Sequence, residues 1–128
     1  MRLVVAAALA AASLSAPALA TGGLLCRPIG GAGPKLSLVI GHGYAPGIAC
    51  ANLMESGRWL STCGPDDPLQ VARSWMDRQR VWIDIIDRRS GREEAKLRAL
   101  VQPKQRIHTA LGTLTRRGKT YKVRCQED

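Results

Sequence analysis

The sequence lacks phenylalanine and has few aromatic side chains of any kind, with three Trp and two Tyr among 128 residues. A hydrophobic core must therefore rest mainly on Leu, Val, Ile and Ala. Histidine is scarce as well, occurring as His42 and His108. Histidine titrates near neutral pH, but neither of these two lies in a metal-binding or nucleophile motif. Two independent loop histidines are the simpler interpretation, so no catalytic residue is predicted.

Sequence motifs that would hold a cofactor or a metal are missing too. The loop at Gly30–Gly33 is not followed by the Lys-Ser or Lys-Thr pair that completes a phosphate-binding loop. Asp66 and Asp67 are too few acids for a cation site. Asp84 lies in an apolar segment, where its pKa could shift, but an outward position on an alternating strand explains it more simply. We therefore predict no cofactor and no metal.

Residues 1–20 have the pattern of a removable export signal. Arg2 supplies the positive start, Leu3–Leu14 is almost wholly Leu, Val and Ala, and Pro17–Ala20 ends in the small-x-small pattern that a signal peptidase accepts. The apolar run is short for a membrane span of about 20 residues. We predict cleavage after Ala20 and a periplasmic or secreted protein that does not span the membrane. An uncleaved anchor is the alternative.

Removal of residues 1–20 leaves 108 residues, the usual size of one domain. One cationic side chain leaves with them, so 18 Lys and Arg face 10 Asp and Glu, and the formal charge is +8. Residues 21–128 contain no internal repeat or low-complexity tract, which favours a single domain. All four cysteines lie in this part of the chain. Because an exported protein meets oxidising conditions, two disulfides are expected.

A β-hairpin is predicted between Cys50 and Cys63. Ser56-Gly57 is a turn signal, and a two-residue loop there pairs residues whose numbers sum to 113. This register sets Met54 against Trp59 and Cys50 against Cys63. The cysteines then form a non-hydrogen-bonded pair, where side chains come close enough for a disulfide. A three-residue loop would shift this register by one.

A second hairpin is predicted around Arg117-Gly118, between residues 108–115 and 120–125, with pair numbers that sum to 235. One face collects apolar side chains and the other polar ones, as in a strand pair with one solvated face. Cys125 belongs to the apolar face and can reach a partner in the core. With Cys50 and Cys63 matched to each other, that partner is Cys26. The two other connectivities and a four-cysteine zinc site are the alternatives.

Two further segments, 36–41 and 81–86, read as strands because β-branched residues and alternation dominate them. Two others are ambiguous between helix and strand. Residues 93–101 alternate like a strand, but Ser90 and Glu93 form a capping box ahead of helically spaced Leu residues. Residues 67–79 could begin a helix at Asp67-Pro68, or alternate as a strand. We predict a mainly β protein, a small antiparallel barrel or sandwich of about 6–8 strands, with one short helix as the main uncertainty.

Basic residues crowd two of the predicted turns. We expect them to gather anions at the ends of the sheet, because Arg and Lys bind oxyanions through charge-assisted hydrogen bonds. In an exported protein the partner would be an acidic glycan, a lipid phosphate or an acidic envelope protein, and not intracellular nucleic acid. The alternative is that charged turns keep a β protein soluble and monomeric. The candidate binding residues are Arg88, Arg89 and Arg92 in one turn and Arg116, Arg117 and Lys119 in the other.

The layout resembles a largely uncharacterised group of small exported, disulfide-tied β proteins of Gram-negative envelopes. The similarity lies in Cys26-Arg27-Pro28, in Leu36–Gly41 and in the ending Gly112-Thr113-Leu114-x-x-x-Gly118-Lys119-Thr120-Tyr121-x-Val123-x-Cys125. There is a looser likeness to periplasmic lysozyme inhibitors, which are small disulfide-tied barrels. Their inhibitory loop motif is not found here, and a +8 protein would be repelled by a basic lysozyme.

These observations favour a non-enzymatic envelope protein that binds an anionic partner. An inhibitor of a periplasmic or extracellular hydrolase is the alternative, with a protruding loop such as Asp66–Leu69 as its contact. An enzyme ranks last, because the sequence offers no convergent nucleophile, base and oxyanion partner.

Overall fold

The computed structural model describes residues 22–41 and 47–128 of the chain. The predicted export signal at 1–20 and the candidate base His42 lie outside these residues. The described residues form nine β-strands, and none of them is helical. They accordingly include no helix with the length and hydropathy needed to cross a membrane. The strands are β1 (Gly22–Pro28), β2 (Lys35–Gly41), β3 (Gly47–Glu55), β4 (Arg58–Ser61), β5 (Leu69–Met76), β6 (Arg80–Asp87), β7 (Glu93–Val101), β8 (Thr109–Arg116) and β9 (Lys119–Glu127).

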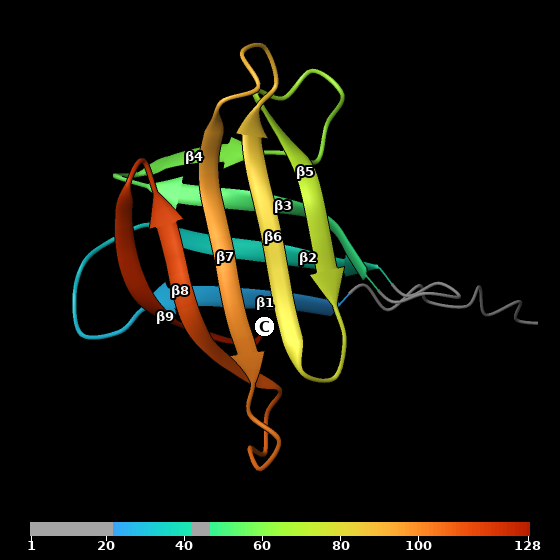
Figure 1. Cartoon of the computed structure of the whole chain (residues 1–128), viewed down its shortest axis with the longest axis vertical. Coiled ribbons are helices and arrows are strands. Elements are labelled where there is room, and N and C mark those ends of the chain that lie inside the picture. Colours follow the sequence, from blue (N-terminus) through green and yellow to red (C-terminus); the bar gives the residue numbers. More distant parts are fainter. Residues whose placement is uncertain (1–21, 42–46) are drawn as a thin grey trace, which may run out of the picture.

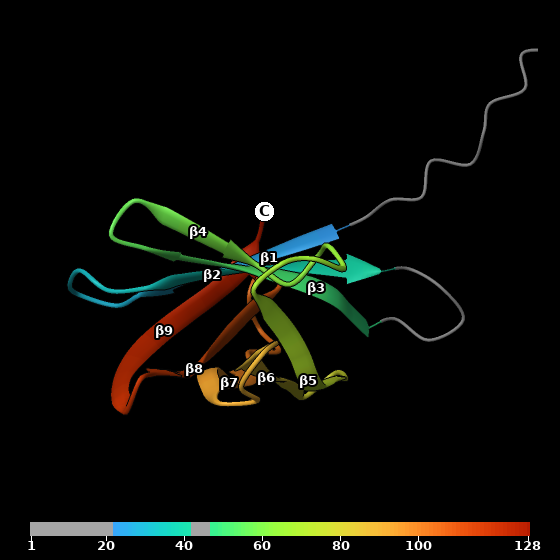
Figure 2. The ribbon, with the colours of Figure 1, turned by 90° about the horizontal axis from the view of Figure 1, so that it is seen from above.

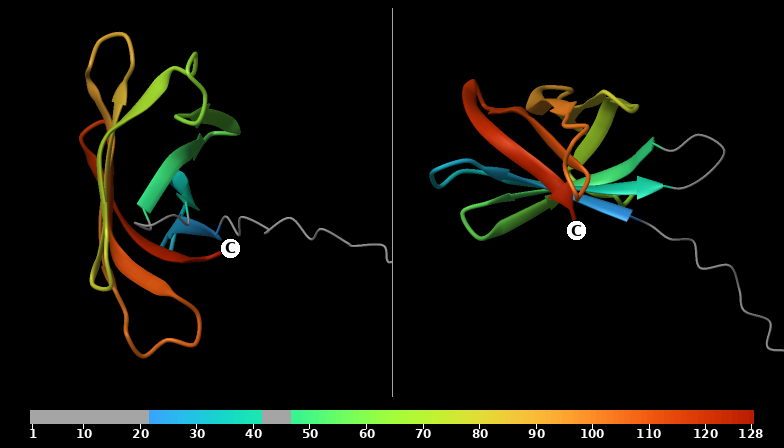
Figure 3. Two further views of the ribbon diagram at one scale, coloured as in Figure 1. Left: turned by 90° about the vertical axis from the view of Figure 1, so that its right-hand side faces the viewer. Right: turned by 90° about the horizontal axis from the view of Figure 1, so that it is seen from below.

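All nine strands belong to one antiparallel sheet in the order β4-β3-β2-β1-β9-β8-β7-β6-β5. Strands that follow one another along the chain are paired, except β4 and β5, and the sheet is continued instead by pairing of β1 with β9. In Figure 1, β5 to β8 run steeply across the front and β1 to β4 cross behind them. β9 sweeps from one group to the other (Figures 2 and 3). The sheet thus curls into a nearly closed barrel, with β5 packed beside β3 and β4 at the open seam.

The strand count is nine and exceeds the predicted six to eight. The additional strand is β1, which the sequence did not reveal as a strand because two glycines begin it and a proline ends it. Its alternation is nevertheless regular, with Leu24 and Cys26 buried and Arg27 exposed. β1 pairs with β2 on one side and β9 on the other, so it is the strand that joins the two ends of the described chain.

Both segments that were ambiguous between helix and strand are strands, so the prediction of a short helix is wrong for the described residues. In β7 the side chains of Ala95, Leu97 and Ala99 are buried and Leu100 is exposed, which is a period of two. Ser90 does not cap a helix. Its backbone N–H and hydroxyl both donate to Asp87, and Gly91 N–H donates to the Asp87 carbonyl, closing the β6–β7 turn.

The two predicted hairpins form with the predicted registers. Met54 faces Trp59 across β3 and β4, and Arg116 faces Lys119 across β8 and β9. In each turn both central residues have positive φ, 50° and 74° at Ser56 and Gly57, and 49° and 78° at Arg117 and Gly118. Positive φ at both positions is the type I′ geometry that suits the twist of a two-residue hairpin.

Two disulfides join Cys26 to Cys125 and Cys50 to Cys63, and no cysteine in the described residues is free. We call them the long-range and the hairpin disulfide. The long-range disulfide is fully buried and ties β1 to β9, as the hairpin registers predict. The core around it is aliphatic, with Leu, Ile, Val and Ala from eight of the nine strands. Its largest fully buried side chains are Leu24, Leu36, Leu38, Leu53, Ile83, Ile85, Leu97, Leu114, Val81 and Val123.

The strands β7 and β8 approach each other unusually closely at Gly112, which faces Ala99. A Cβ atom on Gly112 would lie 1.9 Å from the carbonyl oxygen of Arg98. Real Cβ atoms do not come this close to another heavy atom, so the position requires glycine unless the backbone moves.

Candidate functional site

The six predicted binding residues lie at one end of the barrel. The β6–β7 turn carries Arg88, Arg89 and Arg92, and the β8–β9 turn carries Arg116, Arg117 and Lys119. Ala95 near the start of β7 faces Arg116 at the end of β8, so the two turns lie at the same end of the barrel. Within this group, however, the side chains have different surroundings.

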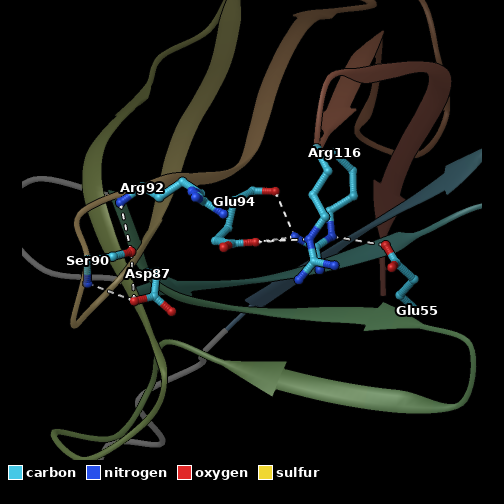
Figure 4. A network of polar contacts seen from close by, with 7 residues as sticks. Glu55, Asp87, Ser90, Arg92, Glu94 and Arg116 are labelled. Atoms are coloured by element: carbon cyan, nitrogen blue, oxygen red, sulfur yellow. Dashed lines mark hydrogen bonds and ion pairs between the residues drawn. The ribbon is translucent and has the colours of Figure 1, made fainter.

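Arg116 is buried, with 5% of its side chain exposed. Its Nε donates to Glu55 Oε2 at 3.0 Å, and its Nη1 donates to Glu94 Oε2 at 2.5 Å and to the Glu94 carbonyl at 3.1 Å (Figure 4). These bonds tie β8 to β7 and to the β3–β4 hairpin. Arg116 is therefore neutralised by carboxylates of the protein, and its donors point toward them.

Arg88 is also occupied within the protein. Its Nε donates to the Asp67 carbonyl at 2.8 Å, and its Nη2 donates to the carbonyls of Gly64 and Leu69, each at 3.2 Å. Asp67 in turn accepts a bond of 2.6 Å from the Gly64 N–H. Arg88 thus fixes the loop that precedes β5. The cations of the two turns that are left exposed are Arg89, Arg92, Arg117 and Lys119.

The carboxylate of Asp87 shapes the β6–β7 turn (Figure 4). It accepts hydrogen bonds from the N–H and the hydroxyl of Ser90 and from the N–H of Arg89. These donors, with Ser90 first, hold the pKa of Asp87 below its usual value despite the opposing effect of desolvation. The turn is therefore shaped by an ionised aspartate, which also offsets part of the local positive charge.

A second group of cations, which the sequence analysis did not single out, covers the outward face of β5 to β9 and β1. Three cross-strand rows alternate with the buried rows of the core. Among the described residues in these rows, one is a carboxylate, Asp84. We call this surface the basic outer face, and its cations are Arg27, Arg73, Arg80, Lys96, Arg98, Lys122 and Arg124.

The carboxylate of Asp84 holds two of these arginines. Arg73 donates to its Oδ2 from Nε at 3.1 Å and from Nη2 at 2.8 Å. Arg98 places Nη2 at 2.8 Å from Oδ1, in ion-pair contact but outside hydrogen-bond geometry. Partial burial acts to raise the pKa of Asp84, but the contacts with the positively charged guanidinium groups of Arg98 and Arg73 outweigh it and lower the pKa. The aspartate therefore stays ionised and keeps both guanidinium groups in place.

Two tryptophans lie beside this ion cluster, directly opposite each other on β5 and β6. The guanidinium carbons of Arg80 and Arg98 each lie 5.3 Å from the ring centroid of Trp82, within cation–π range. Trp75 is 57% exposed, and its Nε1 donates to Asp77 Oδ2 at 2.8 Å. This bond is the main reason that the pKa of Asp77 is lowered, with the N–H groups of Gln79 and Arg80 adding to it.

The tryptophans and the ion cluster line a pocket of about 250 Å³ that is open to solvent on the outside of the barrel. A β-bulge in β5, between Val71 and Arg73, lies at its side and turns the strand locally. Nothing in this pocket has the arrangement of a nucleophile beside a base. It is lined by Arg73, Ser74, Trp75, Trp82, Ile83, Asp84 and Arg98.

Other candidate chemistry finds little support in the described residues. In residues 22–41 and 47–128, no three His, Cys, Asp or Glu side chains come together as a metal-binding group. His108 is half-buried, with its Nδ1 3.8 Å from Glu127 Oε1. No known protein family, curated protein or solved structure matches this chain.

Proposed function

We propose that this protein is an exported, non-enzymatic binding protein for an anionic partner, and that the basic outer face and the exposed cations of the two turns form its contact surface. The observation that carries this proposal is the charge of the outer face, where seven Arg and Lys accompany one carboxylate. Such an excess costs stability through repulsion and attracts polyanions. The two disulfides are compatible with an oxidising, exported environment.

The arginines support binding of oxyanions in particular. A guanidinium presents several N–H donors in a fixed plane that matches carboxylate, sulfate and phosphate groups. Arg73 uses two of its nitrogens on Asp84 and keeps Nη1 without a partner among the described residues, and its side chain is 80% exposed. Because Asp84 and Trp82 already hold the guanidinium groups in place, less side-chain entropy is lost when an anion binds.

Binding of the oxidised protein to inorganic polyphosphate, measured across a salt series, tests this proposal. We expect an affinity that falls steeply as salt increases. Two charge-reversed double variants separate the surfaces, Lys122→Glu with Arg124→Glu on the outer face and Arg89→Glu with Arg92→Glu at the turn. Each variant reverses two exposed cations, so the two change the net charge of the protein equally. The proposal would be refuted if the affinity for polyphosphate did not change with salt, or if it did not fall in the outer-face variant.

A second candidate function, inhibition of a periplasmic or extracellular hydrolase, is favoured by one observation. The loop at residues 62–68 is exposed for the most part, and Arg88 holds it from behind through two side-chain hydrogen bonds to its carbonyls and a third to Leu69 at the start of β5. A preorganised exposed loop is the form in which many inhibitors present their contact segment. If the immobilised protein retains no hydrolase from an envelope extract at low or high salt, this candidate is excluded.

A further inference from the structure

We propose that the pocket beside Trp75 is a subsite for an acidic sugar, that is, one uronic acid residue of a glycan chain. This inference rests on the proposed function and names the chemistry of its ligand. A uronic acid combines a flat apolar face of C–H groups with a carboxylate on the same ring. The pocket offers the complementary pair, an exposed indole ring and guanidinium groups, within one cavity of about 250 Å³.

Trp75 supplies the stacking platform. It is 57% exposed, although burial of a tryptophan would be strongly favourable. Its orientation is fixed by the bond from Nε1 to Asp77 Oδ2, whose carboxylate is itself held by the N–H groups of Gln79 and Arg80 at 2.7 Å. The negative face of an indole attracts polarised C–H groups. A ring that is held in place before binding loses little further freedom when a sugar stacks on it.

The guanidinium groups supply the carboxylate partner. Arg80 is held against the Trp82 ring but is not among the residues that line the pocket, and its charge also acts on Asp77. Arg73 has a free Nη1, as described above. Arg98 acts differently, because its Nη1 already donates to the Leu97 carbonyl at 2.8 Å and its Nη2 lies against Asp84. Arg98 is therefore a positioning residue, which fixes Asp84 and Trp82.

The surroundings of the pocket fit a chain rather than a single sugar. Trp75, Trp82, Arg98, Thr113 and Lys122 form one cross-strand row. With strands about 4.8 Å apart, Lys122 lies roughly 10 Å beyond Arg98 along this row. An acidic glycan that places one residue on Trp75 would meet the hydroxyl of Thr113 and then a further cation.

Single-stranded nucleic acid is the other polyanion that stacks on aromatic side chains. Sites for it usually present several free rings to successive bases. Here Trp82 is occupied by two arginines, which leaves Trp75 as the free ring of the pocket. One ring beside several guanidinium groups fits a glycan better.

The test titrates the oxidised full chain with an oligomer of galacturonic acid and follows tryptophan fluorescence. The comparison ligands are an uncharged galactose oligomer of equal length, inorganic polyphosphate and oligo(dT). We expect the uronate oligomer to bind and to quench fluorescence, and the uncharged oligomer to bind at least about 10-fold more weakly. Trp75→Ala should weaken uronate binding by about 10-fold or more, and Trp75→Tyr should retain most of it.

Trp59→Ala is the matched control, because Trp59 is 63% exposed on β4 and is not among the residues lining the pocket. It should leave uronate affinity unchanged. Uronate binding that survives Trp75→Ala, or equal binding of the uncharged oligomer, overturns the sugar subsite. Tighter binding of oligo(dT) through Trp75 also overturns it. If polyphosphate still binds with the expected salt dependence in these cases, the proposed function stands; if no polyanion binds, both proposals fall.

Discussion

Replacement of Arg116 by alanine should cost far more stability than the same change at its neighbour Arg117. Both side chains contact Glu94 Oε2, at 2.5 Å and 3.4 Å respectively. Arg116 is 5% exposed and also bonds Glu55, whereas Arg117 is 69% exposed. Removing one partner of a buried ion pair leaves the other charge uncompensated and typically costs about 3–5 kcal/mol. An exposed ion pair contributes about 0–1 kcal/mol.

Urea unfolding followed by tryptophan fluorescence measures both free energies on the same oxidised protein. Arg116→Met with Glu94→Gln is a second probe, because it removes both charges and should recover much of the stability that Arg116→Met alone loses. Since Arg116 points into the protein, its variants should bind polyphosphate as well as the unmodified chain does. If Arg116→Ala and Arg117→Ala differ by less than about 1 kcal/mol, the buried ion network does not stabilise the barrel as argued.

Three further predictions concern the rest of the fold. In the chain-entropy account, a disulfide that closes a loop of about 100 residues stabilises by roughly 4.7 kcal/mol, and one that closes about 15 residues by roughly 3 kcal/mol. Loss of the long-range disulfide, whose cysteines are 99 residues apart, should therefore lower the urea midpoint more than loss of the hairpin disulfide, whose cysteines are 13 apart. The reverse order would contradict this account. Gly112→Ala should destabilise by more than about 2 kcal/mol, because its Cβ would meet backbone at 1.9 Å, whereas Gly31→Ala, with no heavy atom within 4 Å, should be nearly neutral in the same assay. Folding lowers the pKa of Asp84, so this carboxylate stabilises the fold above the ordinary aspartate pKa of about 3.9, and its contribution is lost as the pH falls through the folded value. The difference in unfolding free energy between the unmodified protein and Asp84→Asn should thus narrow below about pH 4. A difference that stays constant down to pH 2 would disprove the ion cluster.

The hairpins could be predicted from the sequence because their information is local. Each hairpin has a two-residue turn signal that predicts both the turn and the strand register, namely Ser56-Gly57 and Arg117-Gly118. The cysteine pairing follows from these registers. Strand β1 could not be found this way, because Gly22 and Gly23 weaken its propensity and its pairing with β9 depends on residues about 100 positions away.

The pocket was missed for a related reason. Arg73 and Trp75 alternate as outward positions of a strand, but the sequence pattern of this segment fits a helix as well as a strand, so it does not indicate which face these side chains share. The cation–π contacts of Trp82 come from Arg80, two residues earlier on the same strand, and from Arg98, its partner on the next strand. A cluster assembled across three strands becomes visible only once their registers are known. The burial of Arg116 likewise depends on Glu55, which is distant in sequence.

The two disulfides lie on opposite sides of the same sheet, since Cys26 points inward and Cys50 occupies an outward position beside Val39. During synthesis Cys26 appears first, and both cysteines of the hairpin disulfide become available to it well before Cys125. If Cys26 reacted with the first cysteine available to it, a non-native disulfide would form. Pairing of β1, β2 and β3 needs only local hairpins, which form quickly. Once these three strands pair, Cys26 and Cys50 lie on opposite faces of the sheet. The inward thiol of Cys26 then stays available for Cys125 on β9, the last strand of the chain.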